Sequence, residues 1–208
     1  MPWVSRIMGL SCPVCGGELD APGVCLACRE KLVPNRVAGS VYLGRYARLR
    51  GLVQAVKYRQ NRDALEWSAE CLAAALAQTG WPVEGVVYVP TFFWRAALRG
   101  QYVPEALAAS IARRLGLPVH RALRRRRYTP SQTRRKDRAR LPQVFAALGP
   151  APKRVLLVDD VLTSGATFRQ AARALFEAGS EEVHGVFLAV ADPGRLYRLP
   201  YNRAEARR

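Results

Sequence analysis

The sequence predicts an α/β protein, with a mostly parallel sheet that carries helices on both faces and a small metal-binding segment before it. Three observations support this prediction. Short apolar runs typical of buried strands alternate with longer segments whose apolar residues have helical spacing. Two closely spaced pairs of cysteines lie near the N-terminus. Half of the 208 residues are hydrophobic, which is enough for the core of one α/β domain and a small appendage.

Four cysteines predict a zinc site in the N-terminal segment. Cys12 and Cys15 form one Cys-x-x-Cys pair and Cys25 and Cys28 another, nine residues apart. The chain lacks the apolar segment of a signal peptide and any run able to cross a bilayer, so we expect a cytoplasmic protein without membrane insertion. In a reducing cytoplasm the spacing favours a structural zinc ion over two disulfides. We expect residues 1–39 to form a zinc ribbon that depends on the metal for much of its folding free energy.

Residues 40–208 are expected to form the α/β domain, which opens with a strand and two helices. An apolar run over 41–46 predicts a strand or hairpin arm. Apolar residues at helical spacing predict a helix over 49–58 and a longer one over 64–78. Asp63 is the expected N-cap of the longer helix, because its carboxylate can accept hydrogen bonds from first-turn amides.

The second half of the domain continues the alternation of strand and helix. Residues 86–89 predict a buried strand, and residues 103–115 predict a helix that Gly116 ends. Residues 167–178 predict a further helix, and residues 183–190 a final buried strand. Strands separated by helices favour a parallel sheet, and such sheets bind ligands outside the carboxyl ends of their strands.

The stretch 155–169 carries the strongest functional signal. Four apolar residues, 155–158, predict a buried strand, and Asp159 and Asp160 stand at its end. A small polar loop then leads into the helix: Thr163, Ser164, Gly165, Ala166 and Thr167. Backbone N–H groups, hydroxyls and the positive end of a helix dipole would surround one point, which predicts a phosphate pocket. The two carboxylates beside it are suited to hold the hydroxyl groups of a sugar.

A second loop follows the strand at 86–89 and is expected along the same edge of the sheet. It contains Thr91, Arg95 and Arg99, and the two arginines supply positive charge for an anionic group. The loop itself has little sequence signature, so an ordinary connection between a strand and a helix is an equal alternative.

A strongly basic composition is the second main feature. Thirty-three Lys and Arg against sixteen Asp and Glu give a net charge of +17. The excess is concentrated over 113–140, where twelve basic residues accompany a single acid, Asp137. This surplus favours nucleic acid as a partner over a solvated loop that has no partner. The expected contacts are basic residues of this stretch: Arg124, Arg125, Arg126, Arg127, Arg134, Arg135 and Lys136.

The strand, acid pair, Thr/Ser-Gly loop and helix at 155–169 resemble the phosphoribosyl-pyrophosphate (PRPP) motif of type I phosphoribosyltransferases. The resemblance implies that residues 163–167 hold the 5′-phosphate of PRPP and that Asp159 and Asp160 meet the ribose 2′- and 3′-hydroxyls. It also implies that the loop after the strand at 86–89 binds pyrophosphate and that Mg²⁺ accompanies PRPP. The α/β domain is then expected to have a type I phosphoribosyltransferase-like fold.

The cysteine segment ahead of this motif makes the whole chain resemble the competence protein F (ComF) family. Further matching motifs are Lys57-Tyr58, Val87 to Pro90, Arg99-Gly100, Thr129-x-x-Gln132 and Arg138. The chain departs from the family pattern at Gln101-Tyr102-Val103, at Leu141 and at Thr91. The resemblance implies that the protein binds incoming single-stranded DNA in the cytoplasm during natural transformation. It also implies competence helicase and recombination-mediator proteins as partners, and a basic hood loop over 113–140.

Two functions are favoured over a third, a PRPP-responsive regulator that binds duplex DNA, because the sequence has no helix-turn-helix signature. One is a DNA-binding protein that carries a PRPP pocket. The other is an active Mg²⁺-dependent phosphoribosyltransferase that transfers ribose 5-phosphate from PRPP to an unidentified base or amine. In that enzyme Asp159 and Asp160 would hold the sugar, while positioning and charge stabilisation assist the departure of pyrophosphate. The sequence identifies neither an acceptor nor a clear general base.

Overall fold

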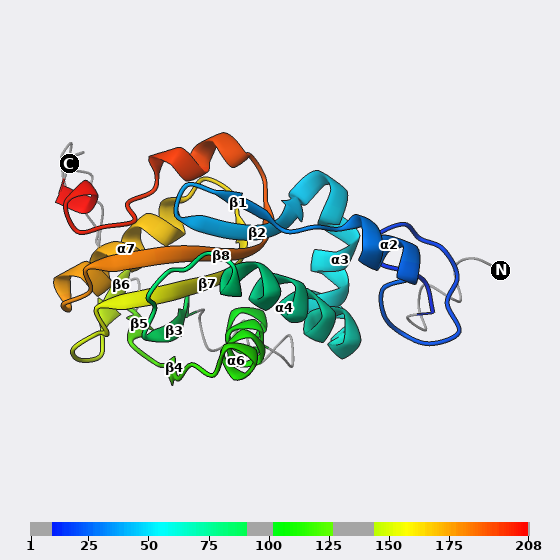
Figure 1. Cartoon of the computed structure of the whole chain (residues 1–208), viewed down its shortest axis with the longest axis horizontal. Coiled ribbons are helices and arrows are strands. Elements are labelled where there is room, and N and C mark those ends of the chain that lie inside the picture. The colour runs from blue at the N-terminus through cyan, green and yellow to red at the C-terminus, as the bar shows by residue number, and fades with distance from the viewer. Residues whose placement is uncertain (1–9, 91–101, 127–143, 208) are drawn as a thin grey trace, which may run out of the picture.

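The computed structural model describes residues 10–90, 102–126 and 144–207, and a six-stranded sheet forms its centre (Figure 1). The strand order is β1-β2-β8-β7-β3-β4, and every neighbouring pair is parallel except the β1–β2 hairpin. The strands of this sheet are β1 (Asn35–Val37), β2 (Ser40–Arg45), β3 (Gly85–Tyr88), β4 (Val119–His120), β7 (Arg154–Leu162) and β8 (Glu182–Val190). The predicted α/β class with a mostly parallel sheet is confirmed.

Helices cover both faces of the sheet, as predicted (Figure 1). One face carries three helices, α3 (Tyr46–Tyr58), α4 (Arg62–Ala77) and α6 (Val103–Leu115). The other face carries α7 (Ala166–Glu177) and the 3₁₀-helix η1 (Pro193–Arg198), which pack around Phe168 and Phe187. Among the described residues, none of the helices is both long and apolar enough to cross a membrane.

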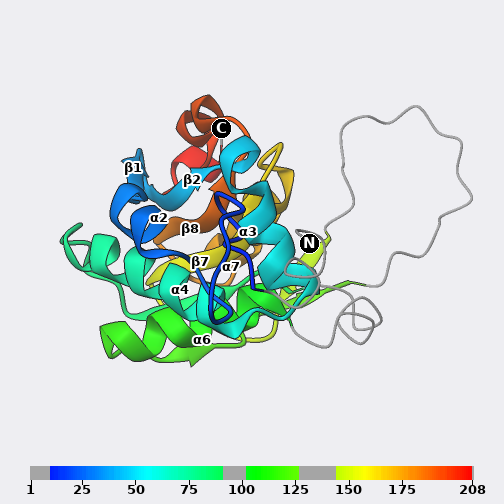
Figure 2. The same ribbon diagram turned by 90° about the vertical axis from the view of Figure 1, so that its right-hand side faces the viewer.

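Smaller elements lie at the margins of this sandwich. The strands β5 (Leu123–Arg125) and β6 (Phe145–Ala147) form a separate antiparallel pair. The C-terminal 3₁₀-helix is η2 (Glu205–Arg207). In the cysteine segment, α2 (Leu26–Lys31) is a short helix that the sequence analysis did not predict. Figure 2 shows this segment lying over α3.

The helix boundaries follow local signals, with one correction. Asn61 caps α4, because its side-chain Oδ1 accepts a hydrogen bond of 2.9 Å from the Ala64 amide. The prediction that Asp63 is the cap was wrong, since Asp63 lies inside the first turn. The predicted end of α6 at Gly116 is confirmed: this glycine has φ 67°, a left-handed conformation that lacks strain without a Cβ atom.

The motif strand is longer than predicted. β7 continues through the acid pair to Leu162, so Asp159 and Asp160 lie within the paired strand and not beyond its end. β8 is equally long and pairs with β7 up to the Leu162↔Val190 position, which explains the extension. Pairing with a neighbouring strand here outweighs the low strand propensity of aspartate. The predicted strand, 155–158, is the fully buried part of β7.

The central sheet includes residues from the segment predicted to be a zinc ribbon. β1 lies within residues 1–39 and pairs antiparallel with β2. The core on the α3 face includes Cys12, Val24 and Leu32 together with residues of α3 and α4. The cysteine segment therefore shares its core with the α/β domain.

Candidate metal and sugar-phosphate sites

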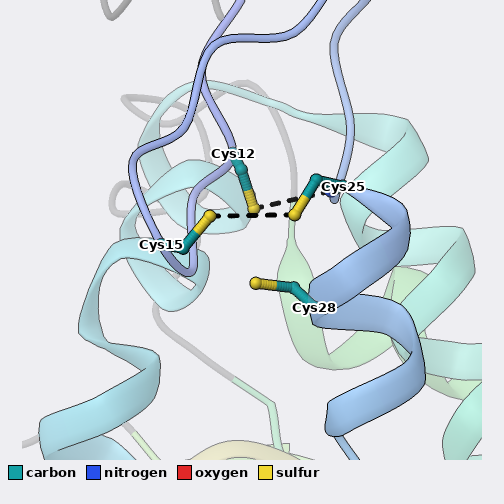
Figure 3. Close-up of side chains that lie close together, drawn as sticks. All are labelled: Cys12, Cys15, Cys25 and Cys28. Carbon is teal, nitrogen blue, oxygen red and sulfur yellow. Dashed lines mark hydrogen bonds between the residues drawn. The ribbon is translucent and has the colours of Figure 1, made fainter.

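Four cysteine side chains converge in the N-terminal segment (Figure 3). The Sγ atoms of Cys12, Cys15, Cys25 and Cys28 all lie within 4.8 Å of one another, and those of Cys15 and Cys25 are 3.7 Å apart. Thiolates bound to zinc at roughly 2.3 Å in a tetrahedron lie about 3.8 Å from one another. All four cysteines are free thiols. The set can hold a metal ion, and its donors and spacing fit zinc.

Local backbone structure presents these thiols. In the first pair the Gly16 amide donates to the Cys12 carbonyl, closing a tight turn. In the second pair Cys25 is the N-cap residue of α2, and Cys28 lies in its first turn. Burial raises the pKa of the Cys12 thiol, but amide hydrogen bonds from Cys15, Cys25 and Val14 outweigh burial and lower it to about 7. The turn therefore favours the thiolate form that binds metals.

The first cysteine pair lies directly on α3. A Cβ atom at Gly51 would collide with the carbonyl oxygen of Pro13, the residue after Cys12. Only glycine at position 51 allows this close approach of two backbones. The position of the metal-binding turn is thus tied to the position of α3.

The acid pair of β7 lies at the carboxyl half of that strand, within reach of the last turn of α3. Asp160 Oδ2 is 2.7 Å from Lys57 Nζ, and these two side chains are 17% and 19% exposed, respectively. The Asp160 amide donates a hydrogen bond of 2.9 Å to Asp159 Oδ1. Burial and the neighbouring charge of Asp160 raise the pKa of Asp159. The two carboxylates therefore have different electrostatic surroundings although they are consecutive.

Two further side chains border the acid pair. The positive charge of Arg125 lowers the pKa of Asp159, opposing the effect of burial, and its guanidinium carbon lies 5.5 Å from the Phe145 ring centroid. The Tyr102 hydroxyl donates a hydrogen bond to the Val89 carbonyl. Burial, followed by the charges of both aspartates, raises the pKa of Tyr102. This edge of the sheet therefore combines two carboxylates with two cations and a phenol.

The predicted phosphate loop connects β7 to α7. Its residues Thr163, Ser164, Ala166 and Thr167 are exposed, whereas Gly165 is buried with φ 76°. A Cβ atom at Gly165 would approach the ends of the Arg169 and Leu199 side chains to 2.9 Å, so both would have to shift, and the positive φ itself favours glycine here.

Two arginines hold the backbone of this loop. Arg195 Nη1 donates a hydrogen bond of 2.7 Å to the Thr163 carbonyl, and Arg169 Nη2 donates one of 3.2 Å to the Ser164 carbonyl. The first amides of α7 have no acceptor within the helix, as in any α-helix, and they mark the positive end of its dipole. Exposed hydroxyls, a helix start and two guanidinium groups thus gather at one loop, a combination that suits an anion.

Several predicted site residues lie outside the described residues: Thr91, Arg95, Arg99, Arg127, Arg134, Arg135 and Lys136. Of the predicted nucleic-acid contacts that are described, Arg124 and Arg126 are exposed. Arg125 is half-buried and interacts with the acid pair instead of projecting fully into solvent.

Sequence reasoning assigned no role to Lys57 or to a polar cluster at the end of β3. In that cluster the Tyr88 hydroxyl donates to Glu105 Oε1 at 2.9 Å, and Arg121 contacts both groups at 2.9 Å. The cluster joins the end of β3 to α6. The sequence offered two signals for Lys57: its place in the Lys57-Tyr58 motif, and its position directly after apolar helix residues.

A groove of about 590 Å³ runs along the outer face of α7, starting at Ala166 beside the phosphate loop. It does not include the acid pair. Its charged and aromatic lining residues are Phe145, Arg169, Arg173, Arg198, Tyr197, Glu177 and Glu205. The Tyr197 ring is 74% exposed.

Comparison with known proteins finds a family match over the segment that contains β7 and α7. Residues 105–203 match the model of the phosphoribosyl transferase domain family. This segment begins in α6 and includes the acid pair, the phosphate loop and α7. The chain therefore carries a phosphoribosyltransferase-like domain. No curated protein sequence matches the chain.

Solved structures similar to the chain include phosphoribosyltransferases. Glutamine PRPP amidotransferase from B. subtilis, complexed with ADP and GMP, is 25% identical, with 65% of this chain and 30% of that chain covered and a TM-score of 0.43. Adenine phosphoribosyltransferase from Leishmania tarentolae is 13% identical, with 77% and 95% covered and a TM-score of 0.47. The allosteric regulatory enzyme of purine biosynthesis is 21% identical, with 67% and 30% covered and a TM-score of 0.44. The chain thus spans less than a third of the amidotransferase and of the regulatory enzyme.

Proposed function

We propose that the protein binds PRPP or a related sugar phosphate at the carboxyl end of β7. Residues 163–167 hold the 5′-phosphate, and Asp159 and Asp160 accept hydrogen bonds from the ribose hydroxyls. The observation that carries this proposal is a half-buried acid pair that lies a few residues before Gly165, the N-cap of α7. Both lie inside a segment that matches the phosphoribosyl transferase domain.

The residues of the pocket have complementary tasks in this proposal. The exposed hydroxyls of Thr163, Ser164 and Thr167 and the first amides of α7 donate to phosphate oxygens. The arginines on the loop carbonyls keep that loop in shape. On the pyrophosphate side, Thr91, Arg95 and Arg99 are the proposed contacts. Mg²⁺, when bound with PRPP, neutralises part of the pyrophosphate charge.

Isothermal titration calorimetry with PRPP and Mg²⁺ tests this proposal. We expect saturable binding that Asp160→Asn weakens about tenfold or more, because it removes a charge-assisted hydrogen-bond acceptor. Asp159→Asn should weaken binding less, because the raised pKa of Asp159 favours its neutral form. Asp20→Asn is the matched control, since Asp20 is an exposed aspartate of the cysteine segment. Absence of binding by the unaltered chain, or equal binding by all variants, contradicts the proposal.

A transferase activity is the natural extension of such a pocket. Departure of pyrophosphate would leave a positively charged sugar that the nearby carboxylates stabilise, and an incoming base or amine would form the new bond at the anomeric carbon. Pyrophosphate release from PRPP, measured with a panel of bases and amines, tests this activity. If the unaltered chain releases pyrophosphate no faster than the double variant Asp159→Asn with Asp160→Asn, the transferase activity is rejected. The proposal that the chain binds PRPP is unaffected by that result.

We propose as a second function that the chain binds single-stranded DNA. The supporting observations are the net charge of +17, the exposed Arg124 and Arg126, and the groove on α7 with three arginines and the exposed ring of Tyr197. Arginines neutralise phosphates, and an exposed aromatic ring can stack on a base. By its resemblance to the ComF family, we place this function in the cytoplasm during natural transformation, with competence helicase and recombination-mediator proteins as partners.

Fluorescence anisotropy with a labelled oligonucleotide tests this second function. We expect affinity to fall linearly with salt on logarithmic axes, with the slope reduced by about 0.7 for each phosphate contact removed. Arg124→Gln with Arg126→Gln should reduce that slope, whereas Arg62→Gln, at an exposed position of α4, should not. No affinity at low salt rejects the function.

We also propose that the ion held by the four cysteines is zinc and that its role is structural. Four thiolates fill its coordination sphere and leave no position for a substrate. Metal analysis of the purified chain should give about one zinc ion per chain, and Cys12→Ser with Cys15→Ser should abolish it.

A further inference from the structure

We propose that Lys57 is a positioning residue of the sugar-phosphate pocket: it fixes the orientation of the Asp160 carboxylate towards the ribose hydroxyls. This inference rests on the proposed binding of PRPP. Lys57 lies in α3, outside the residues 105–203 that match the phosphoribosyl transferase domain. The pocket would thus depend on an element that the matched domain does not contain.

The geometry of the ion pair supports a specific role. Lys57 Nζ lies 2.7 Å from Asp160 Oδ2, and less than a fifth of either side chain is exposed. The exposed pair Lys153–Glu181 has a distance of 3.2 Å, with 66% and 56% of the side chains exposed. Exposed pairs contribute little because solvent screens them, whereas a shielded pair with a short contact fixes its carboxylate.

The Lys57–Asp160 ion pair places a positive charge beside two adjacent carboxylates. Asp159 and Asp160 are consecutive, and the Asp160 amide donates to Asp159 Oδ1. Two shielded carboxylates side by side repel each other, which favours protonation of one of them. Lys57 supplies the compensating charge at Asp160, so this carboxylate can accept hydrogen bonds from ligand hydroxyls.

The backbone of α3 keeps the ammonium group in place. Val53 and Val56 are buried in the core on this face of the sheet, so the last turn of α3 cannot rotate freely. After Tyr58 the chain turns sharply, and the amides of Arg59 and Asn61 both donate to the Ala55 carbonyl. Lys57 therefore extends towards β7 from a fixed helix end.

Residue type also matters at this position. Lysine accounts for only 4 of the 33 basic residues, so a lysine at position 57 is unusual for this arginine-rich sequence. A compact ammonium group occupies one carboxylate oxygen, whereas a planar guanidinium group tends to occupy both. Lysine at 57 leaves Asp160 Oδ1 available for a ligand.

Calorimetry with PRPP and Mg²⁺ on five variants tests the inference. Lys57→Met should weaken PRPP binding about tenfold or more, as loss of a charge-assisted contact does. Lys57→Arg should retain part of the affinity, and the matched control Lys153→Met should bind like the unaltered chain. In the double variant Lys57→Met with Asp160→Asn, binding should be no weaker than in Asp160→Asn alone, because Lys57 acts through that carboxylate.

The outcomes distinguish failure of this inference from failure of the proposed PRPP binding on which it rests. Failure of the unaltered chain to bind PRPP overturns both. PRPP binding with Lys57→Met equal to the Lys153→Met control, or additive losses in the double variant, overturns only the role of Lys57. Thermal unfolding without ligand shows whether each variant folds. If Lys57→Met does not fold, Lys57→Arg is compared with the control Lys153→Arg. Equal affinity of these two variants for PRPP overturns the positioning role of Lys57.

Discussion

Two consecutive aspartates of β7 are identical in chemistry but differ in environment. Asp160 has Lys57 at 2.7 Å, whereas Asp159 accepts a backbone amide and lies among buried groups. Successive side chains of a strand point in different directions, which explains how Asp160 contacts Lys57 directly while Asp159 does not. The two members of the acid pair therefore have different contacts although they are adjacent in the sequence.

The pH dependence of stability should report Asp159. Burial and Asp160 raise the pKa of Asp159 to about 8 in the folded protein, above the roughly 3.9 of an unfolded chain. Folding then takes up a proton between these values, so the contribution to stability is full below about pH 4 and is lost as the pH rises through about 8. Urea unfolding at about pH 5 and about pH 8 should show a larger loss for the unaltered chain than for Asp159→Asn. Equal losses would show that Asp159 is ionised throughout.

At the scale of elements, α4 offers a test of its observed cap. Asn61→Ala removes the acceptor for the Ala64 amide and should lower the free energy of unfolding by ~1 kcal/mol. Asp63→Ala, at the position that the sequence favoured, should have a smaller effect, since only the dipole interaction of a first-turn carboxylate is lost. Chemical denaturation of both variants measures the difference, and a larger effect at Asp63 would contradict the assignment.

The contact between α3 and the first cysteine pair offers a second test. Gly51→Ala places a methyl group against the Pro13 carbonyl, and backbone cannot move away as a flexible side chain can. Overpacking should cost about 1–3 kcal/mol, and a backbone contact this short favours the upper part of that range, so the ~1 kcal/mol that alanine gains in helix propensity offsets only part of it. Faster zinc transfer to a chromogenic chelator should accompany it. Gln54→Ala, at an exposed position of α3, is the control and should transfer zinc at the original rate.

Removal of the metal is a test for the whole molecule. Because Cys12, Val24 and Leu32 belong to the core on the α3 face, loss of the ion should loosen this core and leave the α7 face intact. We expect chelation to lower the midpoint of thermal unfolding by roughly 5–15 °C, since 1 kcal/mol shifts a chain of this size by about 2–4 °C. Cys71→Ser should keep the metal, because Cys71 lies outside the cluster. An unchanged midpoint after chelation would contradict a structural ion.

Sequence patterns predicted the features that depend on nearby residues in the chain. They missed the features that depend on contacts between segments far apart in the sequence. The cysteine spacing and the apolar periodicity of β3, β8 and α6 are local signals, and all reappear in the structure. The extension of β7 through its aspartates depends on pairing with β8, which no window of sequence contains. The contact of Lys57 with Asp160 joins residues about a hundred positions apart, and only the packing of α3 on the sheet creates it.

Helix α3 meets three demands at once: its apolar stripe packs on the sheet, Gly51 admits the metal-binding turn, and Lys57 reaches the acid pair. Six residues separate the last two, about 9 Å along the axis. Saturation mutagenesis should therefore show an uneven profile along this helix. Arg48, Arg50 and Gln54, whose side chains are exposed, should accept most replacements, while positions 51 and 57 should reject even small ones.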